Sequence, residues 1–208
     1  TIPTARYHLA RKNLGYGKGH NLAVAMAPPS TYHLIINPDL VITQGALGKM
    51  VDFMEQHQDI GLLGPRFLNP DGSTQFLNRR YPSVLDILAR RLPQKMSTFK
   101  TLQRVKYHEM HDVGYDVVTD VPCTSGACML FRRAALEEVG GFDIRYFMYC
   151  EDFDLCCSLR KSGWRTVYYP AAEMTHLWAR SSAKEIRMTF EHIRSIVLFF
   201  NKWGWKWK

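Results

Sequence analysis

Three acidic side chains at the start of one predicted helix are the residues of this chain best suited to acid–base chemistry. Glu151, Asp152 and Asp154 follow the aromatic stretch 147–149, and apolar residues then recur at helical spacing up to Gly163. The free N–H groups and the dipole of a helix favour negative charge in its first turn. We therefore expect these carboxylates to have lowered pKa values and to stay ionised, as a general base must. An ordinary helix start with Asp as a cap explains the same residues.

The segments on either side of this helix have the pattern of an alternating α/β domain. Upstream, an apolar run over residues 126–131 leads into a short predicted helix over 134–139, which ends at the turn 140–143. Downstream, residues 163–170 predict a strand, and His176 follows it. Because strands and helices alternate along the whole chain, we expect a three-layer α/β fold.

Two stretches nearer the N-terminus could also bind a ligand. Residues 32–36 predict a short buried strand that ends at Asn37 and Asp39, and open α/β sheets present ligand-binding groups at such strand ends. A turn that caps the predicted helix 43–57 explains the same two residues. The glycines of residues 15–19 precede a helical stretch, which is a weak signal for a phosphate-binding loop and equally suits a tight turn.

The positive charge is concentrated in two segments. The net charge is +8, and residues 79–106 and 180–208 hold most of the Lys and Arg. Such patches favour a phosphate-bearing partner: nucleic acid, anionic lipid or a diphosphate-linked substrate, with a merely solvated face as the alternative. Nucleic acid is the weakest of the three, because no single stretch interleaves aromatic and basic residues in an RNA-binding pattern and the acidic cluster would repel phosphates.

The C-terminal segment predicts an amphipathic helix over 183–201 and a tail that alternates Trp with Lys. Indole rings among amines suit a membrane interface, although a tail that packs on the core would look the same. We therefore divide the chain into residues 1–182, a catalytic domain, and residues 183–208, a candidate membrane-interface element. The tail residues are Lys202, Trp203, Trp205, Lys206, Trp207 and Lys208.

Length and cysteine content limit the other possibilities. A chain of 208 residues with 46% hydrophobic residues suits one globular domain with a sizeable core. Its apolar runs are shorter than the roughly 18–20 residues that span a bilayer. The five cysteines suit reduced thiols in a cytoplasmic protein. A zinc site at Cys123, Cys128 and His176 is conceivable but lacks a CxxC pair.

The order of the later motifs resembles the inverting family 2 glycosyltransferases, in particular their bacterial rhamnosyltransferase-like branch. The shared signature is a small-residue strand, a GGFD turn at 140–143, the ED pair Glu151 and Asp152, a strand that begins with Gly-Trp, and then His176. The resemblance covers residues 13–182. It implies the GT-A fold, a three-layer, Rossmann-like nucleotide-sugar-binding domain with a mixed central sheet.

The resemblance also implies roles for individual residues. Asp152 corresponds to the general base, and Glu151 would orient the acceptor or the neighbouring loop. Asn13, Gly15 and Asn21 match an element that lines the nucleotide-sugar site. Asn37 and Asp39 occupy the DxD position, where carboxylates hold a divalent metal, and here Asn37 replaces the first acid. Asp39 and His176 would hold Mg²⁺ or Mn²⁺.

The implied substrates are a nucleotide-sugar donor and a glycan or lipid-linked acceptor. The branch favours dTDP-L-rhamnose as donor and a lipid-diphosphate-linked or polysaccharide acceptor, as in the assembly of surface glycans such as O-antigen, without nucleic acid as a partner. Together with the Trp/Lys tail, a lipid-linked acceptor predicts a peripheral location on the inner face of the bacterial plasma membrane. Family members usually carry one more strand–helix–strand unit before the position of Asn13, so this chain is expected to begin inside that unit.

Three other functions remain open from the sequence. One is a non-catalytic module that binds nucleic acid or another polyanion. Another is a nucleotidyltransferase, which shares acids at strand ends and a metal but would have a GxGTR-type loop that this chain lacks. The last is a pseudo-glycosyltransferase, suggested by Asn37.

Overall fold

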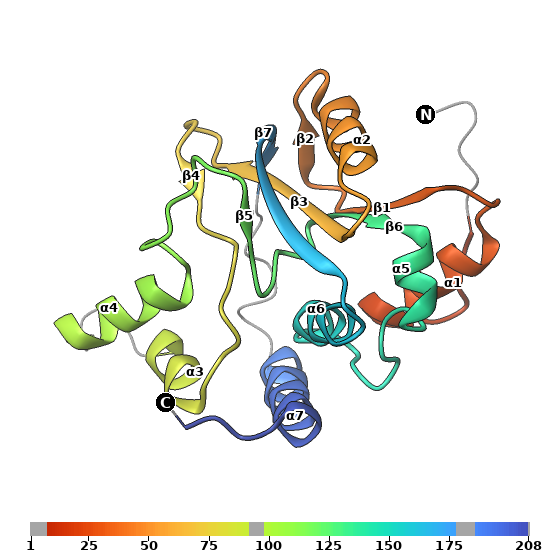
Figure 1. Cartoon of the computed structure of the whole chain (residues 1–208). Helices are drawn as coiled ribbons and strands as arrows, with labels where there is room; N and C mark the ends of the chain where they lie inside the picture. The colour runs from red at the N-terminus through yellow and green to blue at the C-terminus, as the bar shows by residue number, and fades with distance from the viewer. Residues whose placement is uncertain (1–7, 92–97, 178–185, 208) are drawn as a thin grey trace.

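The computed structural model describes residues 8–91, 98–177 and 186–207 (Figure 1). Its helices are α1 (Tyr16–Met26), α2 (Ala46–Gln56), α3 (Val84–Arg91), α4 (Phe99–His108), α5 (Arg133–Glu138), α6 (Glu151–Lys161) and α7 (Ile186–Trp203). Its strands are β1 (Tyr32–Ile36), β2 (Leu40–Ile42), β3 (Ile60–Leu68), β4 (Thr74–Gln75), β5 (Thr119–Asp120), β6 (Cys128–Arg132) and β7 (Arg165–His176).

One mixed sheet organises the described chain. Its strands follow the order β1-β6-β3-β7-β2, with β4 paired to β3 and β5 paired to β7. The long central strands β3 and β7 run parallel, and the other pairs are antiparallel. Because β2 pairs with the end of β7, Leu40 lies opposite His176. This register brings the chain just after β1 to the carboxyl end of β7.

Alternate residues of the sheet face two different layers of helices. On β6, Cys128 and Leu130 pack with α2, while Met129 and Phe131 pack with α5 and α6. This alternation follows from the two-residue period of a strand. Figure 1 shows α2 apart from α5 and α6, with the sheet between them. The predicted three-layer α/β architecture with a mixed sheet is therefore confirmed.

A separate cluster joins α7 to the rest of the domain. Phe199 and Phe200 of α7 pack against Tyr146 and Cys157, on the side of α6 away from the sheet. The chain after α7 runs beside α3, where the Val84 N–H donates to the Lys206 carbonyl at 2.8 Å. The C-terminal segment thus closes over α6 and α3, as Figure 1 shows.

Several predicted boundaries differ from the structure. The expected glycine loop is wrong beyond Gly15, because α1 begins at Tyr16 and includes Gly17 and Gly19. Gly17 is buried against Phe142, where a Cβ would come within 2.8 Å of that side chain, so the glycine permits close packing of a helix. The predicted strand 163–170 continues to His176. Residues 183–185 of the expected last helix, and 178–182 at the proposed domain boundary, lie outside the described residues.

The structure also bears on the cysteines and on the possibility of a membrane-spanning helix. All five cysteines are buried and free of disulfides. Among the described helices, none is both long and apolar enough to cross a bilayer.

Candidate active site

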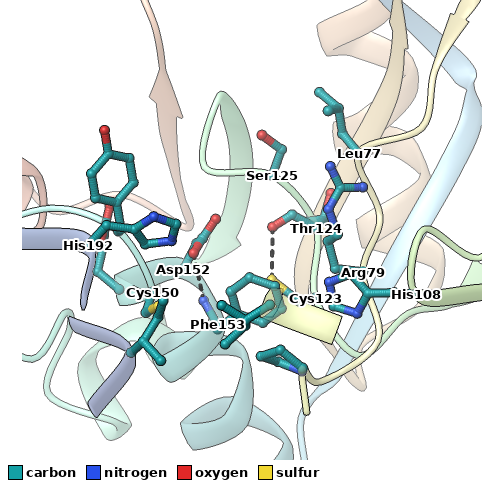
Figure 2. A pocket seen from close by; sticks show the side chains of 15 residues that line it. Leu77, Arg79, His108, Cys123, Thr124, Ser125, Cys150, Asp152, Phe153 and His192 are labelled. Atoms are coloured by element: carbon teal, nitrogen blue, oxygen red, sulfur yellow. Dashed lines mark hydrogen bonds between the residues drawn. The ribbon is translucent and has the colours of Figure 1, made fainter. Parts of the chain in front are cut away.

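A cavity of about 450 Å³ lies where α6, α3 and α7 meet the loop that precedes β6. Figure 2 shows Asp152 facing this cavity opposite Thr124 and Ser125, with Arg79 and His108 on the far side and His192 of α7 close by. Apolar side chains from three helices and from the loop between β4 and α3 complete the walls: Leu77, Pro82, Ile87, Phe153 and Ile196. Apolar walls with a few polar groups are a common form of small-molecule site.

An uncommon backbone conformation aims the first turn of α6 into the cavity. Tyr149 and Cys150, directly before the helix, have φ of 71° and 63°. Left-handed residues other than Gly, Asn and Asp are rare, and such strain gathers at functional sites. The Tyr149 ring lies 4.7 Å from the His192 ring, and Ser195 donates to the Met148 carbonyl at 2.8 Å. Contacts from α7 therefore support this strained turn.

Burial reverses the expected pKa shift of the two leading acids. We expected the helix start to lower the pKa values of Glu151 and Asp152, and that prediction is wrong. Burial raises the pKa of Glu151 to about 8, and the neighbouring Asp152 charge adds to the rise. Burial also raises the pKa of Asp152, although backbone hydrogen bonds from Phe153 and Gly126 oppose it. Desolvation of a carboxylate outweighs the helix dipole here. A carboxylate with a raised pKa is a stronger base once ionised.

The second set of predicted residues lies at the carboxyl ends of β1 and β7. His176 Nε2 is 3.5 Å from Asp39 Oδ2. The Leu177 N–H donates to the Asp39 carbonyl at 2.9 Å, which holds the two segments together. The other carboxylate oxygen, Asp39 Oδ1, is buried and has no hydrogen-bond partner among the described residues. The structure thus brings Asp39 and His176 together, as the metal prediction requires.

The chemistry of this pair suits a hard divalent cation. A buried carboxylate oxygen without a partner is costly unless a ligand satisfies it. One carboxylate and one imidazole suit Mg²⁺ or Mn²⁺, which take their remaining ligands from phosphates and water. Within the described ranges, no cluster of three or more His, Cys, Asp or Glu could hold a metal by protein ligands alone. Asp39 and His176 therefore fit a metal that a bound diphosphate helps to hold.

One short loop links the two sites. The Asn37 N–H donates to the Ala127 carbonyl at 2.8 Å, directly after β1. Gly126, the residue before Ala127, provides a backbone hydrogen bond to Asp152, and its carbonyl accepts one from the Tyr16 hydroxyl. Residues 125–127 thus lie between the β1 end that carries Asp39 and the α6 turn that carries Asp152.

The three N-terminal residues predicted to bind the donor make contacts within the protein. Asn13 Oδ1 accepts the Gly15 N–H at 2.9 Å. Gly15 has φ of 80° and lies directly against the Phe147 carbonyl, so a side chain there would collide. Asn21 accepts the Phe142 N–H at 2.9 Å and donates to the Phe142 carbonyl at 2.7 Å. These residues brace the segment before α6, and donor contact by them stays a prediction.

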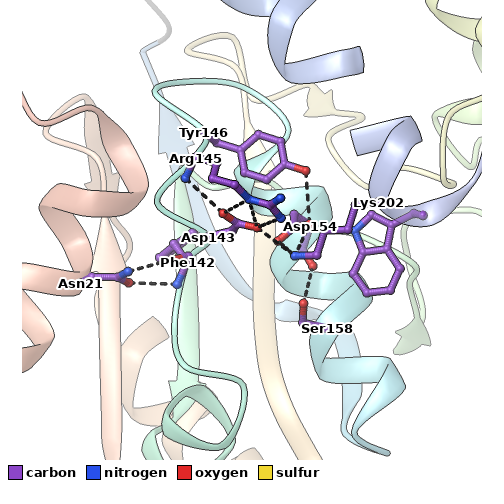
Figure 3. Close-up of polar contacts among 9 residues, drawn as sticks. Asn21, Phe142, Asp143, Arg145, Tyr146, Asp154, Ser158 and Lys202 are labelled. Carbon is purple, nitrogen blue, oxygen red and sulfur yellow. Dashed lines mark hydrogen bonds and ion pairs between the residues drawn. The ribbon is translucent and has the colours of Figure 1, made fainter. Parts of the chain in front are cut away.

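The third acid of the first turn has a different environment. Asp154 is 1% exposed and accepts hydrogen bonds from Lys202, Trp203 and Tyr146 at 2.9, 2.7 and 3.2 Å (Figure 3). Lys202 also reaches Asp143 of the GGFD turn at 3.1 Å. The Arg145 guanidinium holds the pKa of Asp143 well below its usual range, and Lys202 makes a smaller contribution in the same direction. Two tail residues that we assigned to a membrane interface are thus internal anchors.

Sequence reasoning missed most of the cavity walls. Arg79 and His108 come from a basic region to which we assigned no site residue, and Thr124 and Ser125 lie in the loop before β6. His192 lies in the predicted C-terminal helix, to which we had given only a membrane role. The small residues around Gly126 were the one available signal for that loop. Gln75, which contacts His176, stands in a two-residue strand that leaves no periodic signal.

Comparison with known proteins decides the family. The profile described as Glycosyltransferase like family 2 matches residues 3–194. The chain belongs to this family. Among curated relatives, it is 32% identical over 198 residues to the N-acetylglucosaminyl-diphospho-decaprenol L-rhamnosyltransferase of Mycobacterium tuberculosis, covering 88% of this chain and 62% of that protein. It is 29% identical over 170 residues to rhamnosyltransferase WbbL of Escherichia coli (strain K12), covering 77% of this chain and 61% of that protein. The chain thus spans about three fifths of the length of these relatives.

A solved structure agrees on the fold. The chain superposes on a crystal structure of GalNAc-T7 with UDP, GalNAc and Mn²⁺ with a TM-score of 0.62 and 13% identity. The match covers 93% of this chain and 36% of that one. The glycosyltransferase chain thus has the GT-A fold that the resemblance implied.

Proposed function

We propose that this chain is an inverting glycosyltransferase that moves L-rhamnose from dTDP-L-rhamnose to a glycan or lipid-diphosphate-linked acceptor in the synthesis of a surface polysaccharide. The observation that carries the proposal is Asp152, a carboxylate with a raised pKa that faces a cavity in a family 2 glycosyltransferase. The names of the two bacterial relatives support rhamnose, and that of the Mycobacterium tuberculosis enzyme supports a lipid diphosphate as acceptor.

The proposed reaction is one displacement. Asp152 takes the proton of an acceptor hydroxyl as that oxygen attacks the anomeric carbon. The new carbon–oxygen bond forms on the face opposite the bond to the diphosphate, which breaks and leaves its electron pair on the diphosphate oxygen. The configuration at the anomeric carbon is therefore inverted. Glu151, with its pKa of about 8, is largely protonated at neutral pH and can donate a hydrogen bond to the acceptor or to the loop.

Asp39 and His176 would hold Mg²⁺ or Mn²⁺ against the donor diphosphate, and such an ion stabilises negative charge on a leaving phosphate. Asn37, which follows the same strand β1 as Asp39, would accept a hydrogen bond from the donor through its amide oxygen. Asn13, Gly15 and Asn21 would act on the donor indirectly, through the segment at 142–147 that they brace. Residues 1–182 would form the catalytic domain, to which α7 adds a wall of the cavity.

A screen of nucleotide sugars tests this function. Release of nucleoside diphosphate would be measured with dTDP-L-rhamnose, UDP-glucose and GDP-mannose, each with Mn²⁺ and with EDTA. We expect dTDP-L-rhamnose to be consumed fastest, and turnover to be lost in EDTA and restored by Mn²⁺ or Mg²⁺. Preference for another sugar would contradict the donor assignment. Full turnover in EDTA would contradict the metal assignment, and no turnover with any donor would favour a pseudoenzyme.

We further propose that the protein binds the cytoplasmic face of a bacterial membrane through α7 and the tail. Phe190, Ile193 and Val197 of α7 are 69%, 46% and 40% exposed, and Trp205 and Trp207 are 47% and 65% exposed. Exposed rings and apolar side chains near Lys206 suit an anionic interface, where each basic residue adds on the order of 1 kcal/mol. The diphosphate of a lipid-linked acceptor would lie in the same headgroup layer of the membrane.

Flotation with vesicles of phosphatidylglycerol tests this location. The variant Phe190→Ser/Trp207→Ala should float less than the wild type, and Phe99→Ser, an equally exposed ring on α4, serves as the matched control. Salt should weaken binding, since charge is screened over about 8 Å at physiological ionic strength. Equal flotation of both variants and the wild type would contradict a role for α7.

A further inference from the structure

A chain of hydrogen bonds connects the β3–β4 hairpin to His176. The Ser73 hydroxyl donates to Asp71 Oδ1 at 2.6 Å, and Asn69 Nδ2 donates to Ser73 Oγ at 2.8 Å. Gln75 Nε2 then donates to Asn69 Oδ1 at 2.8 Å. Gln75 Oε1 lies 3.0 Å from His176 Nδ1. Gln75 is 6% exposed, so this last contact is buried.

Two groups that can only accept hydrogen bonds determine the direction of every bond in this chain. The Asp71 carboxylate requires Ser73 to donate its proton, so Ser73 must accept from the Asn69 amide nitrogen. That leaves the Asn69 amide oxygen facing Gln75, which must donate to it. The His176 carbonyl gives the same answer independently, because it also accepts from Gln75 Nε2, at 2.9 Å.

The orientation of the Gln75 amide then determines the proton on His176. With its nitrogen bound to two acceptors, Gln75 presents its oxygen to His176 Nδ1. An amide oxygen cannot donate, so Nδ1 must carry the proton. In a neutral imidazole the lone pair is then on Nε2, the nitrogen that lies 3.5 Å from Asp39.

We propose that Gln75 is a positioning residue that holds His176 in the tautomer protonated on Nδ1, so that Nε2 and Asp39 together present electron pairs to a divalent cation. This inference rests on the metal site under Proposed function and assigns the residue that orients one of its ligands. A hydrogen bond to the non-ligating nitrogen of a His fixes the ring and its tautomer, and its loss typically weakens metal binding about 10–100-fold.

Nitrogen NMR of the metal-free protein, labelled with ¹⁵N-histidine, reads the tautomer directly. The His176→Asn spectrum identifies the His176 signals. We expect the wild type to carry the proton on Nδ1. Gln75→Met, which keeps the approximate volume but lacks both amide groups, should shift the population toward protonation on Nε2. Gln75→Glu should keep Nδ1 protonated, because its carboxylate still accepts. Gln58→Met, at an exposed glutamine that bonds only to Glu55 among the described residues, is the matched control.

Titration of the same proteins with Mn²⁺ alone, followed by electron paramagnetic resonance, gives the second readout. Gln75→Met should bind Mn²⁺ about 10–100-fold more weakly than the wild type and Gln58→Met. A wild type protonated on Nε2, or an unchanged tautomer in Gln75→Met, would overturn the assignment. A merely structural role for Gln75 predicts the same tautomer in all three Gln75 proteins. Absence of Mn²⁺ binding by a wild type with the expected tautomer would refute the proposed metal and support the role of Gln75 in orienting His176.

Discussion

Asp152 and Asp154 stand two residues apart in the first turn of α6, yet their surroundings differ in kind. Asp152 faces a cavity, and its carboxylate accepts hydrogen bonds from the backbone of Phe153 and Gly126. Asp154 faces α7 and is enclosed by Lys202, Trp203 and Tyr146. Both acids share one helix dipole, so the dipole cannot separate their roles.

The difference separates the proposed base, Asp152, from the structural acid, Asp154. The structural acid has a cation and two neutral donors that bond to its carboxylate. Asp152 forms no ion pair with the described residues, and burial raises its pKa although backbone hydrogen bonds and the Arg79 charge oppose the rise. The C-terminal helix therefore contributes to both roles: it supplies the partners of Asp154 and also forms one wall of the cavity beside Asp152.

The largest effect on stability should come from Asp154→Asn. The change keeps the size of the side chain but removes the negative charge to which Lys202 and Trp203 donate hydrogen bonds. Breaking a buried pair costs about 3–5 kcal/mol, and we expect the lower end, because Lys202 is partly exposed and keeps Asp143. For about 200 residues, 3 kcal/mol corresponds to a fall of about 6–12 °C in Tm.

Thermal unfolding followed by circular dichroism measures this loss. Asp52→Asn, at an exposed acid on α2, is the matched control and should change stability by less than about 0.5 kcal/mol. If Asp154→Asn and the control have the same Tm, the contacts from α7 do not stabilise α6. The two acids would then differ less than their surroundings indicate.

The next largest effect is on the pH dependence of stability, through Glu151, the third carboxylate of the same turn. Its pKa is raised from 4.5 to about 8, so between these values the folded protein holds a proton that the unfolded chain has lost. The unfolding free energy therefore falls as pH rises through this window, by at most about 1.4 kcal/mol per pH unit. Glu151→Gln should flatten this dependence.

Urea denaturation at pH 5, 6, 7 and 8 gives the unfolding free energy of each protein. Glu55→Gln, at an exposed acid on α2, should keep the wild-type slope. The same pH dependence in the wild type and Glu151→Gln would show that Glu151 is ionised in the folded state, as the helix dipole alone predicts.

The smallest effect should come from Trp203→Phe, which removes one donor from Asp154 and keeps most of the ring packing. A hydrogen bond to a charged group contributes about 1.5–3 kcal/mol, and we expect the lower end since Lys202 remains. Trp205→Phe removes an indole N–H that bonds to the exposed Asn201 amide, and it should cost less. Equal melting temperatures for the two variants would argue against an internal role for Trp203.

Much of the fold could be predicted from local patterns. The strand at 32–36 and the helices after residues 45 and 150 follow from apolar periodicity, turn residues and acids at a helix start. The glycines of α1 were misjudged, because the packing of Phe142 against Gly17 is a tertiary contact. The two short helices of residues 84–108 lacked any clear pattern, since their exposed faces mix basic and large apolar side chains.

The site could be predicted only in part. Asp39 and His176 were named from the motif, and strand pairing brings them together. The pKa values of the acids depend on burial, which sequence spacing does not reveal. The partners of Asp154 lie 48 and 49 residues away along the chain, so Lys202 and Trp203 were assigned to the membrane instead.

The most direct test of the whole account is the turnover of Asp152→Asn with dTDP-L-rhamnose and Mn²⁺, measured beside wild type. Loss of a general base costs about 10²–10⁴-fold in rate, whereas Asp152 forms no ion pair with the described residues whose loss would destabilise the helix. We predict a loss of that size with a melting temperature within about 2 °C of wild type, since about 1 kcal/mol shifts Tm by 2–4 °C at this size. Wild-type turnover by Asp152→Asn would contradict the account and would leave Asp152, like Asp154, a structural acid.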